Sequence, residues 1–163
     1  LDPLASTNAQ HYYPILRKAE VFLNYAEAAN EAWGPKGKDP DGICKFTAYQ
    51  VIKTIRQTSG GITDTKYLDE MAASKESFRI LIQNERRLEL AFENQRYYDM
   101  RRCLLPLNEA VKGVLVTKEG DDLIYTFQKV EDRKFDGIRY YYSPLPYYEC
   151  VKNPNLVNNL GWK

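Results

Sequence analysis

Histidine and paired cysteines are almost absent from this sequence. Its 163 residues include one histidine, His11, and three scattered cysteines, Cys44, Cys103 and Cys150, none in a C-x-x-C pair. A structural zinc site needs four such ligands at short, regular spacing. We therefore expect no metal and no cofactor. The odd number of cysteines favours reduced or partly buried thiols, and one long-range disulfide stays open.

The sequence also lacks an excess of either charge and lacks long apolar runs. Lys and Arg number 23 and Asp and Glu 22, for a formal net charge of +1. That balance argues against nucleic acid as a partner, and the pair Arg101-Arg102 is too short for a basic patch. No run approaches the roughly 18 apolar residues of a spanning helix, and no signal peptide is visible before Leu1. The abrupt start fits a cytoplasmic protein or a fragment of a longer one.

Tyrosine, by contrast, is abundant. Its 13 residues outnumber 6 phenylalanines and 2 tryptophans. Tyrosine combines an apolar ring with a polar tip, which suits wet interfaces and surfaces that face sugars. The same residue also fills ordinary half-buried positions. Trp33, Tyr67 and residues 140–142 are the candidates for sugar contact, although no motif assigns a ligand-binding residue.

The first half of the chain has the apolar spacing of helices. Residues 15–33, with Pro14 in the first turn, and residues 44–58 are expected to form a helical hairpin like a tetratricopeptide unit. Gly34 and Ser59 follow these helices as stop signals. The expected buried stripes contain Leu16, Ala19, Leu23, Ala26 and Asn30 on the first helix, and Ala48, Val51, Ile52 and Ile55 on the second.

Further elements follow from local signals. A helical turn is expected over residues 67–72, a long helix over 75–92 with Ser74 as N-cap, and a short helix over 95–103 after a break at Asn94. Residues 114–116 and 123–127 predict a small β-hairpin, and residues 137–142 a further extended piece. An irregular tail over 143–163 completes the chain. The fold class is therefore mainly α, in a single domain over residues 1–163.

Carboxylates fall on the apolar side of two predicted helices. On the long helix, the expected buried stripe contains Phe78, Leu81, Ile82, Leu88 and Phe92. At 100° per residue, Glu85 and Glu89 lie about 20° on either side of Phe78, within that stripe. Glu20 and Glu27 share the side of Leu16 and Leu23. Unpaired buried carboxylates cost several kcal/mol each, on the order given for ions in protein interiors. These acids therefore need compensation from other side chains.

Three explanations compete for the acids. The first explanation is a buried ion-pair network. It is favoured because arginines are abundant nearby and bind carboxylates through two parallel hydrogen bonds. A di-metal site would need Glu-x-x-His on two helices, which is missing. An acid/base pair made of Glu85 and Glu89 would suit glycoside hydrolysis. However, arginine-rich surroundings favour the ionised carboxylate, which is the wrong state for a general acid.

Four blocks resemble the SusD/RagB family in the family's order. Residues 15–28, ILRKAEVFLNYAEA, are similar to its R-x-A-E-V-x-L-x-Y-A-E-A helix, and residues 48–56 resemble the helix that follows. Residues 84–102, NERRLELAFENQRYYDMRR, resemble E-R-R-x-E-L-A-F-E-G-x-R-x-x-D-L-R-R. The segments 144–149, PLPYYE, and 153–162, NPNLVNNLGW, resemble the family's ending. Asn94 replaces a glycine and Leu160 a proline.

The resemblance implies a largely helical binding protein and not an enzyme. Family members are lipoproteins on the outer face of the bacterial outer membrane, held by an N-terminal lipid anchor that this chain lacks. They bind an oligosaccharide, polysaccharide or other nutrient for import through a SusC-like TonB-dependent transporter. The chain is then a C-terminal fragment of a longer protein. The alternative is a scaffold or transporter-docking module that makes no direct glycan contact.

In that setting the acids are expected to be structural. We predict that they lock the long helix, the short helix and the first hairpin together. The predicted ion-pair network comprises Glu20, Glu27, Glu85, Glu89, Glu93, Arg96, Asp99 and Arg102.

Overall fold

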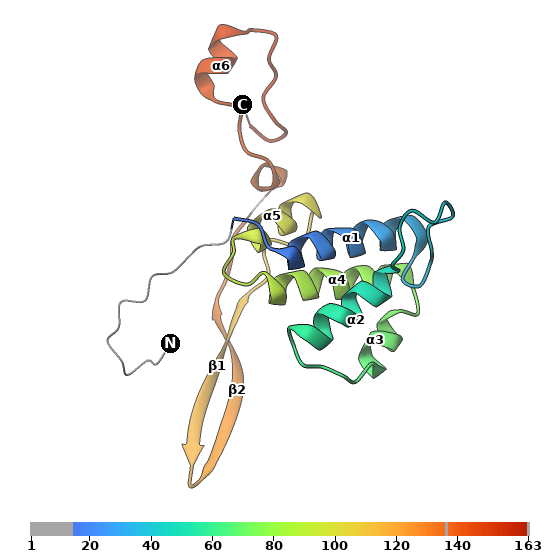
Figure 1. The fold of residues 1–163 in the computed structure, drawn as a ribbon. Helices are drawn as coiled ribbons and strands as arrows, with labels where there is room; N and C mark the ends of the chain where they lie inside the picture. The colour runs from blue at the N-terminus through green and yellow to red at the C-terminus, as the bar shows by residue number, and fades with distance from the viewer. Residues whose placement is uncertain (1–14, 136, 163) are drawn as a thin grey trace. The chain divides into compact units, whose positions relative to one another are not determined.

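A computed structural model describes residues 15–135 and 137–162. The chain divides into two compact units, residues 1–93 and 94–163. The described elements are mainly helices with one small antiparallel sheet, which confirms the expected fold class (Figure 1). Whether the two units form one domain stays a prediction. Unit 1 contains α1 (Lys18–Trp33), α2 (Ala48–Thr58), α3 (Lys66–Met71) and α4 (Lys75–Glu89); unit 2 contains α5 (Gln95–Arg102), β1 (Val111–Glu119), β2 (Asp122–Glu131), the 3₁₀ helix η1 (Ile138–Tyr141) and α6 (Tyr147–Lys152).

The first two helices begin later than predicted. Arg17 is extended and α1 starts at Lys18, while the predicted role of Pro14 lies outside the described residues. Helix α2 starts only after Thr47, because Thr47 and Gln50 form a capping box: each backbone N–H donates to the other side chain, at 2.9 and 3.2 Å. This exchange satisfies two otherwise unpaired N–H groups and fixes the helix start.

The long helix begins where the sequence predicted and ends earlier. The Ser74 side chain accepts a hydrogen bond from the Ser77 N–H at 3.1 Å, which confirms the N-cap. Helix α4 ends at Glu89 instead of Phe92: the backbone already leaves the helical conformation at Leu90, and Phe92 has a φ of 65°. Asn94 has a φ of 61°, so the expected left-handed break before α5 is confirmed.

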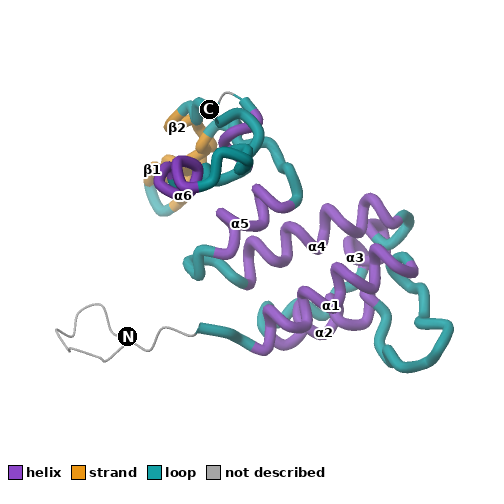
Figure 2. The backbone as a smooth tube through the Cα atoms, turned by 90° about the horizontal axis from the view of Figure 1, so that it is seen from above, coloured by secondary structure: helices purple, strands orange, loops and turns teal. Residues whose placement is uncertain are grey.

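The core of unit 1 lies between α1, α2 and α4. Helix α1 packs on both other helices, and it runs beside α4 in both views (Figure 2). Asn30 is fully buried on α1 and donates its side-chain N–H to the backbone oxygen of Lys75, at 3.0 Å. This bond ties α1 to the first turn of α4. The largest fully buried apolar side chains are Leu23, Ile52, Leu68, Phe78, Leu81 and Ile82.

Three residues expected in the buried stripes are exposed instead. Leu16 is 66% exposed because it precedes α1 and is not helical. Leu88 is 60% exposed at the edge of the stripe, one residue before α4 ends, and Phe92 lies beyond the helix and is 101% exposed. The stripe on α4 is thus confirmed only for about its first three turns, up to Glu85.

The β-hairpin is longer than predicted. Strands β1 and β2 have 9 and 10 residues and pair antiparallel from Val111 and Glu131 to Glu119 and Asp122. Gly120 supplies the positive φ of 64° that the tight turn needs. Every residue of β2 and all but two residues of β1 are exposed, so most of the hairpin is uncovered within the described residues.

The C-terminal segment differs from its prediction in two places. Residues 138–141 form a 3₁₀ helix and not an extended piece, and the tail contains the short helix α6. Short-range backbone bonds form both helices, and hydrogen bonds from the last residues hold the segment between them, as described below. Among the described residues, none of the helices combines the length and apolar character of a membrane-spanning segment.

Candidate functional site

Two side-chain clusters could carry function: the ion pairs of unit 1 and a tyrosine-rich cleft in unit 2. In the first, Arg17 holds the end of α4. Its guanidinium lies 3.2 Å from a Glu89 carboxylate oxygen and 2.8 Å from a Glu93 carboxylate oxygen, and it donates to the Glu89 backbone oxygen at 2.5 Å. The hydrogen bond to Glu93 raises the pKa of Arg17, so this side chain stays charged.

A second pair is more deeply buried. Arg56 on α2 donates to the carboxylate of Glu85 on α4, and only 13% and 9% of the two side chains are exposed. Arg56 also lies over the ring of Tyr67, with its central carbon 5.8 Å from the ring centroid. The pair joins α2 to α4 from within, so the carboxylate on the apolar stripe is compensated.

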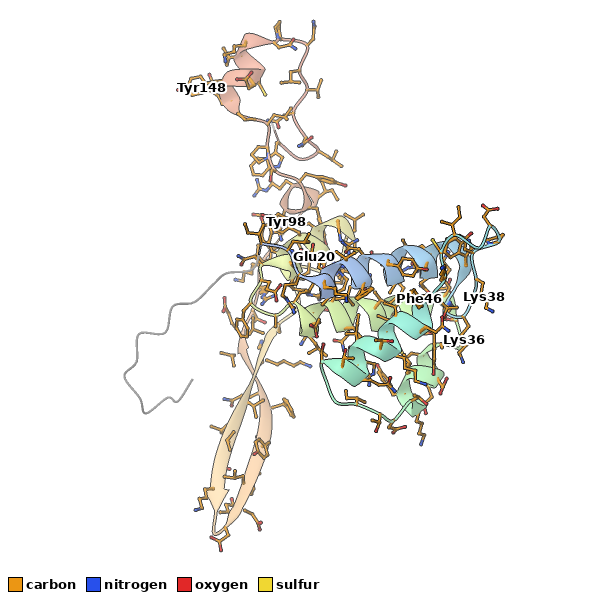
Figure 3. The ribbon with its side chains drawn as sticks, in the orientation of Figure 1. Glu20, Lys36, Lys38, Phe46, Tyr98 and Tyr148 are labelled. Atoms are coloured by element: carbon orange, nitrogen blue, oxygen red, sulfur yellow. The ribbon has the colours of Figure 1, made fainter. Side chains whose placement is uncertain are left out.

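The remaining predicted network members divide into three groups. Arg86 donates to Asn24 at 2.5 Å and lies 3.9 Å from Glu27. In unit 2, Arg102 binds Asp99 at 2.8 Å. Glu20 and Arg96 are half-buried and have no ion-pair partner among the described residues. Figure 3 labels Glu20 on α1. The structural role of the network as a whole stays a prediction.

The acids are poorly placed for chemistry. Glu85 pairs with Arg56 and Glu89 pairs with Arg17, so each carboxylate already binds a guanidinium. Among residues 15–135 and 137–162, no three histidine, cysteine or acidic side chains are grouped as metal ligands would be. These ion pairs connect α2 to α4 and the residue before α1 to the end of α4.

The second cluster is an open cleft of about 440 Å³ in unit 2. One wall is α5, which contributes Tyr97, Tyr98 and Arg101, and the other is the end of η1, with Tyr141 and Tyr142. We call this the tyrosine–arginine cleft; its remaining lining residues are Arg102, Leu104 and Ser143. Its volume lies within the range of about 300–1,000 Å³ that is usual for small-ligand sites.

The α5 wall carries exposed rings and a stacked arginine. Tyr97 and Tyr98 are 54% and 63% exposed and meet edge to face, with ring centroids 5.2 Å apart. The central carbon of the Arg101 guanidinium lies 3.5 Å from the centroid of Tyr97, and the same group donates to the Tyr97 backbone oxygen at 3.0 Å. Arg101 has no carboxylate partner among the described residues.

The opposite wall is held through its backbone. The Tyr141 hydroxyl donates to the Leu105 backbone oxygen at 2.9 Å, which fixes η1 against the end of α5. The Trp162 indole N–H donates to the backbone oxygen of Tyr142 at 2.9 Å, and the Asn159 side-chain N–H donates to the backbone oxygen of Ser143 at 2.7 Å. The tail thereby clamps the segment that lines the cleft.

Gly161 makes that clamp possible. Its φ is +85°, and an added Cβ would lie 2.8 Å from the Arg139 Cβ and 3.1 Å from the Arg139 backbone. Only glycine allows this approach without strain. Arg139 in turn lies near the rings of Tyr140 and Trp162, at 4.9 and 5.9 Å from their centroids.

Of the aromatic candidates named from sequence, Tyr141 and Tyr142 line the cleft. Trp33 packs against the core of unit 1, Tyr67 lies beside Arg56, and Tyr140 packs edge to face against Phe135. The sequence reasoning missed Tyr97, Tyr98 and Arg101. The run Tyr97-Tyr98 and an arginine four residues after Tyr97 could have indicated a stacked pair on a helix.

The chain matches the model described as the SusD family over residues 2–162. It therefore belongs to the SusD family. It is 31% identical over 161 residues to SusD-like protein P2 of Formosa agariphila, covering 97% of this chain and 26% of that protein. It also resembles the crystal structure of a SusD-like protein from Bacteroides fragilis, with 32% identity, a TM-score of 0.64, and coverage of 92% of this chain and 26% of the other.

The chain thus spans about a quarter of the length of each relative. Proteins of the SusD family are associated with nutrient and glycan binding at the cell surface and are binding proteins, not enzymes. They work with SusC-like transporters.

Proposed function

We propose that the protein containing this chain binds an oligosaccharide or another nutrient, without catalysis, for import through a SusC-like TonB-dependent transporter. Its place would be the outer face of the outer membrane, held by an N-terminal lipid anchor. The observation that carries this proposal is the family match over residues 2–162, which leaves almost no part of the chain outside the family pattern.

The geometry supports binding over catalysis. The carboxylates that could act as acid and base are engaged by Arg56 and Arg17. The cleft in unit 2 instead offers exposed tyrosine rings, and rings of this kind stack on the apolar faces of sugars, with polar groups at the rim to orient the ligand.

Calorimetric titration of the whole parent protein with a panel of oligosaccharides tests the proposal. We expect saturable binding of at least one member and no release of reducing sugar during long incubation. Affinity purification from outer membranes should recover a SusC-like transporter. An unrelated protein of similar size serves as the control. Sugar release that depends on Glu85 would contradict the proposal and would support the hypothesis that the protein is a glycoside hydrolase.

A scaffold role without glycan contact is the second candidate, and two observations favour it. The hairpin exposes Val114, Val116, Tyr125 and Phe127 at 49%, 49%, 60% and 75%, although paired strands of this kind are stable only with a covered face. Phe92 is fully exposed as well. We propose that the rest of the parent chain packs on the hairpin and on Phe92, because the relatives are about four times as long as this chain.

One substitution measured in two contexts tests the scaffold role. Phe127→Lys should change the free energy of unfolding of this chain by less than about 1 kcal/mol, because the ring is exposed. In the parent protein it should cost about 3 kcal/mol, as for a buried aromatic that is lost. Equal, small costs in both contexts would contradict a covered hairpin.

A further inference from the structure

We propose that the tyrosine–arginine cleft binds an acidic oligosaccharide, one that carries uronate carboxylates or sulfate esters. The proposal rests on the proposed function and adds a site and a ligand class to it. Two features carry the argument: an arginine that has no carboxylate partner among residues 15–135 and 137–162, and exposed tyrosine rings on both walls of the cleft, one of which is held through its backbone.

Arg101 differs from the paired arginines of unit 1 in its surroundings. Arg17 and Arg56 each contact carboxylates of the same unit. Arg101 has no acidic partner among the described residues, yet it is held in place by the face of Tyr97 and by one bond to a backbone oxygen. The stacking orders the guanidinium and leaves its other N–H groups at the cleft. An ordered, uncompensated guanidinium is suited to bind a carboxylate or sulfate.

The rings supply the second half of the recognition. Tyr98 and Tyr142, from the two walls, are 63% and 42% exposed. A pyranose ring presents an apolar face of C–H groups, which an exposed aromatic ring can cover, while the phenolic hydroxyl remains available to sugar hydroxyls. A charge beside a stacking surface matches a sugar that carries an anionic substituent and matches a neutral sugar less well.

The walls are preorganised, which lowers the cost of binding. The Tyr141 hydroxyl joins the end of η1 to the loop after α5, and Trp162 and Asn159 hold the backbone at Tyr142 and Ser143. A ligand entering the cleft does not need to order this segment, so less of the contact energy is lost to entropy.

Tyrosine variants test the stacking, with a control from the same unit. Tyr98→Ala should weaken binding of an oligogalacturonate roughly five- to tenfold, which corresponds to the loss of one aromatic contact, whereas Tyr98→Phe should retain it. Tyr148→Ala is the matched control: Tyr147 and Tyr148 form a similar edge-to-face pair on α6, with centroids 5.7 Å apart, outside the cleft (Figure 3). We expect the Tyr148→Ala affinity to stay within about twofold of wild type, as for a surface substitution.

Arginine variants test the charge. Arg101→Gln should weaken oligogalacturonate binding at least about tenfold, because a hydrogen bond to a charged group is lost, and Arg101→Lys should lose part of the affinity. Arg87→Gln removes the same charge from an exposed position on α4 and should have little effect. Binding should also weaken as salt is raised.

The experiment is calorimetry on the whole parent protein with three probes of similar length: an oligogalacturonate, a sulfated oligogalactan and a neutral malto-oligosaccharide. Stronger binding of either acidic probe, lost in Tyr98→Ala and Arg101→Gln only, supports the cleft and identifies carboxylate or sulfate as the group bound. Glycan binding that every variant retains would refute the cleft and leave the proposed function standing. Binding of no acidic probe by a folded wild-type protein would also refute the cleft, while the proposed function is decided separately by the panel of oligosaccharides described above.

Discussion

Breaking the pair between Arg56 and Glu85 should be the most damaging single change to a charge in unit 1. Glu85→Leu removes the carboxylate and leaves the guanidinium, whose side chain is 13% exposed, without a counter-charge. Removing one partner of a buried pair costs about 3–5 kcal/mol. Because neither side chain is completely buried, we expect the lower end, about 3 kcal/mol.

The double variant isolates the interaction. Arg56→Met combined with Glu85→Leu replaces both charges by apolar groups of similar volume, and such replacements are often neutral or stabilising. We therefore expect the double variant to recover at least about half of the loss. Urea titration is the assay: with a slope of about 2 kcal/mol per molar, the single variant should lower the midpoint by roughly 1.5 M.

Two further acids calibrate this result. Glu89→Gln should cost about 1 kcal/mol, since Arg17 keeps Glu93 as a second partner. Glu20→Gln should cost less than about 0.5 kcal/mol, because Glu20 has no ion-pair partner among the described residues. An unchanged midpoint for Glu85→Leu, or equal losses at all three positions, would refute the idea that these acids brace the helices. An unchanged thermal stability of Glu89→Gln would count against it too.

The other predictions concern pH, strain and the tail. The two hydrogen bonds from Arg79 lower the pKa of Glu31 below its usual 4.5. The pair therefore stabilises the fold above pH 4.5, and this stabilisation is lost as the pH falls through the lowered pKa. Urea titration at several pH values should show that Glu31→Gln costs about 0.5 kcal/mol at pH 7, a value discounted for solvent exposure, and nothing in strong acid. Phe92→Ala should lower the free energy of unfolding by less than about 1 kcal/mol, whereas Phe78→Ala should lower it by about 3–5 kcal/mol. The reason is that the ring of Phe92 is fully exposed and that of Phe78 is fully buried. Equal losses of stability in thermal unfolding would contradict this expectation. Gly161→Ala should loosen the tail and shift the fluorescence of the adjacent tryptophan to the red, whereas Gly120→Ala, with a similar positive φ and open space, should not.

Local signals in the sequence predicted most of the helices and could not predict what joins them. Ser74 as N-cap and the break at Asn94 were readable because each depends on its nearest neighbours. The partner of Glu89 could not be predicted, because Arg17 lies 72 positions away in the sequence and several other arginines were equally plausible partners. The early end of α4 was not predicted, because phenylalanine rarely adopts a positive φ and the sequence around Phe92 gives no signal for one.

The cleft shows a different limit of sequence reasoning. Residues 138–141 were expected to be extended, but they form a 3₁₀ helix with its own short-range backbone bonds, and Trp162 and Asn159 bind the segment that follows it. A contact between segments about 20 residues apart leaves no periodic pattern. The aromatic run at residues 140–142 was recognisable as a candidate surface, but which of its rings face a cavity depends on that contact.

The bonds that hold the cleft end on backbone oxygens, and this separates its frame from its recognition surface. Trp162, Asn159 and the Tyr141 hydroxyl bind the carbonyl groups of Tyr142, Ser143 and Leu105. Those carbonyls keep their positions whichever side chain stands at residue 142. Tyr142→Ser should therefore leave the tail clamp and the thermal stability almost unchanged and should weaken acidic oligosaccharide binding about fivefold. A variant that unfolds the tail instead would show that the ring is part of the frame, and that the wall cannot be changed for a new ligand without rebuilding it.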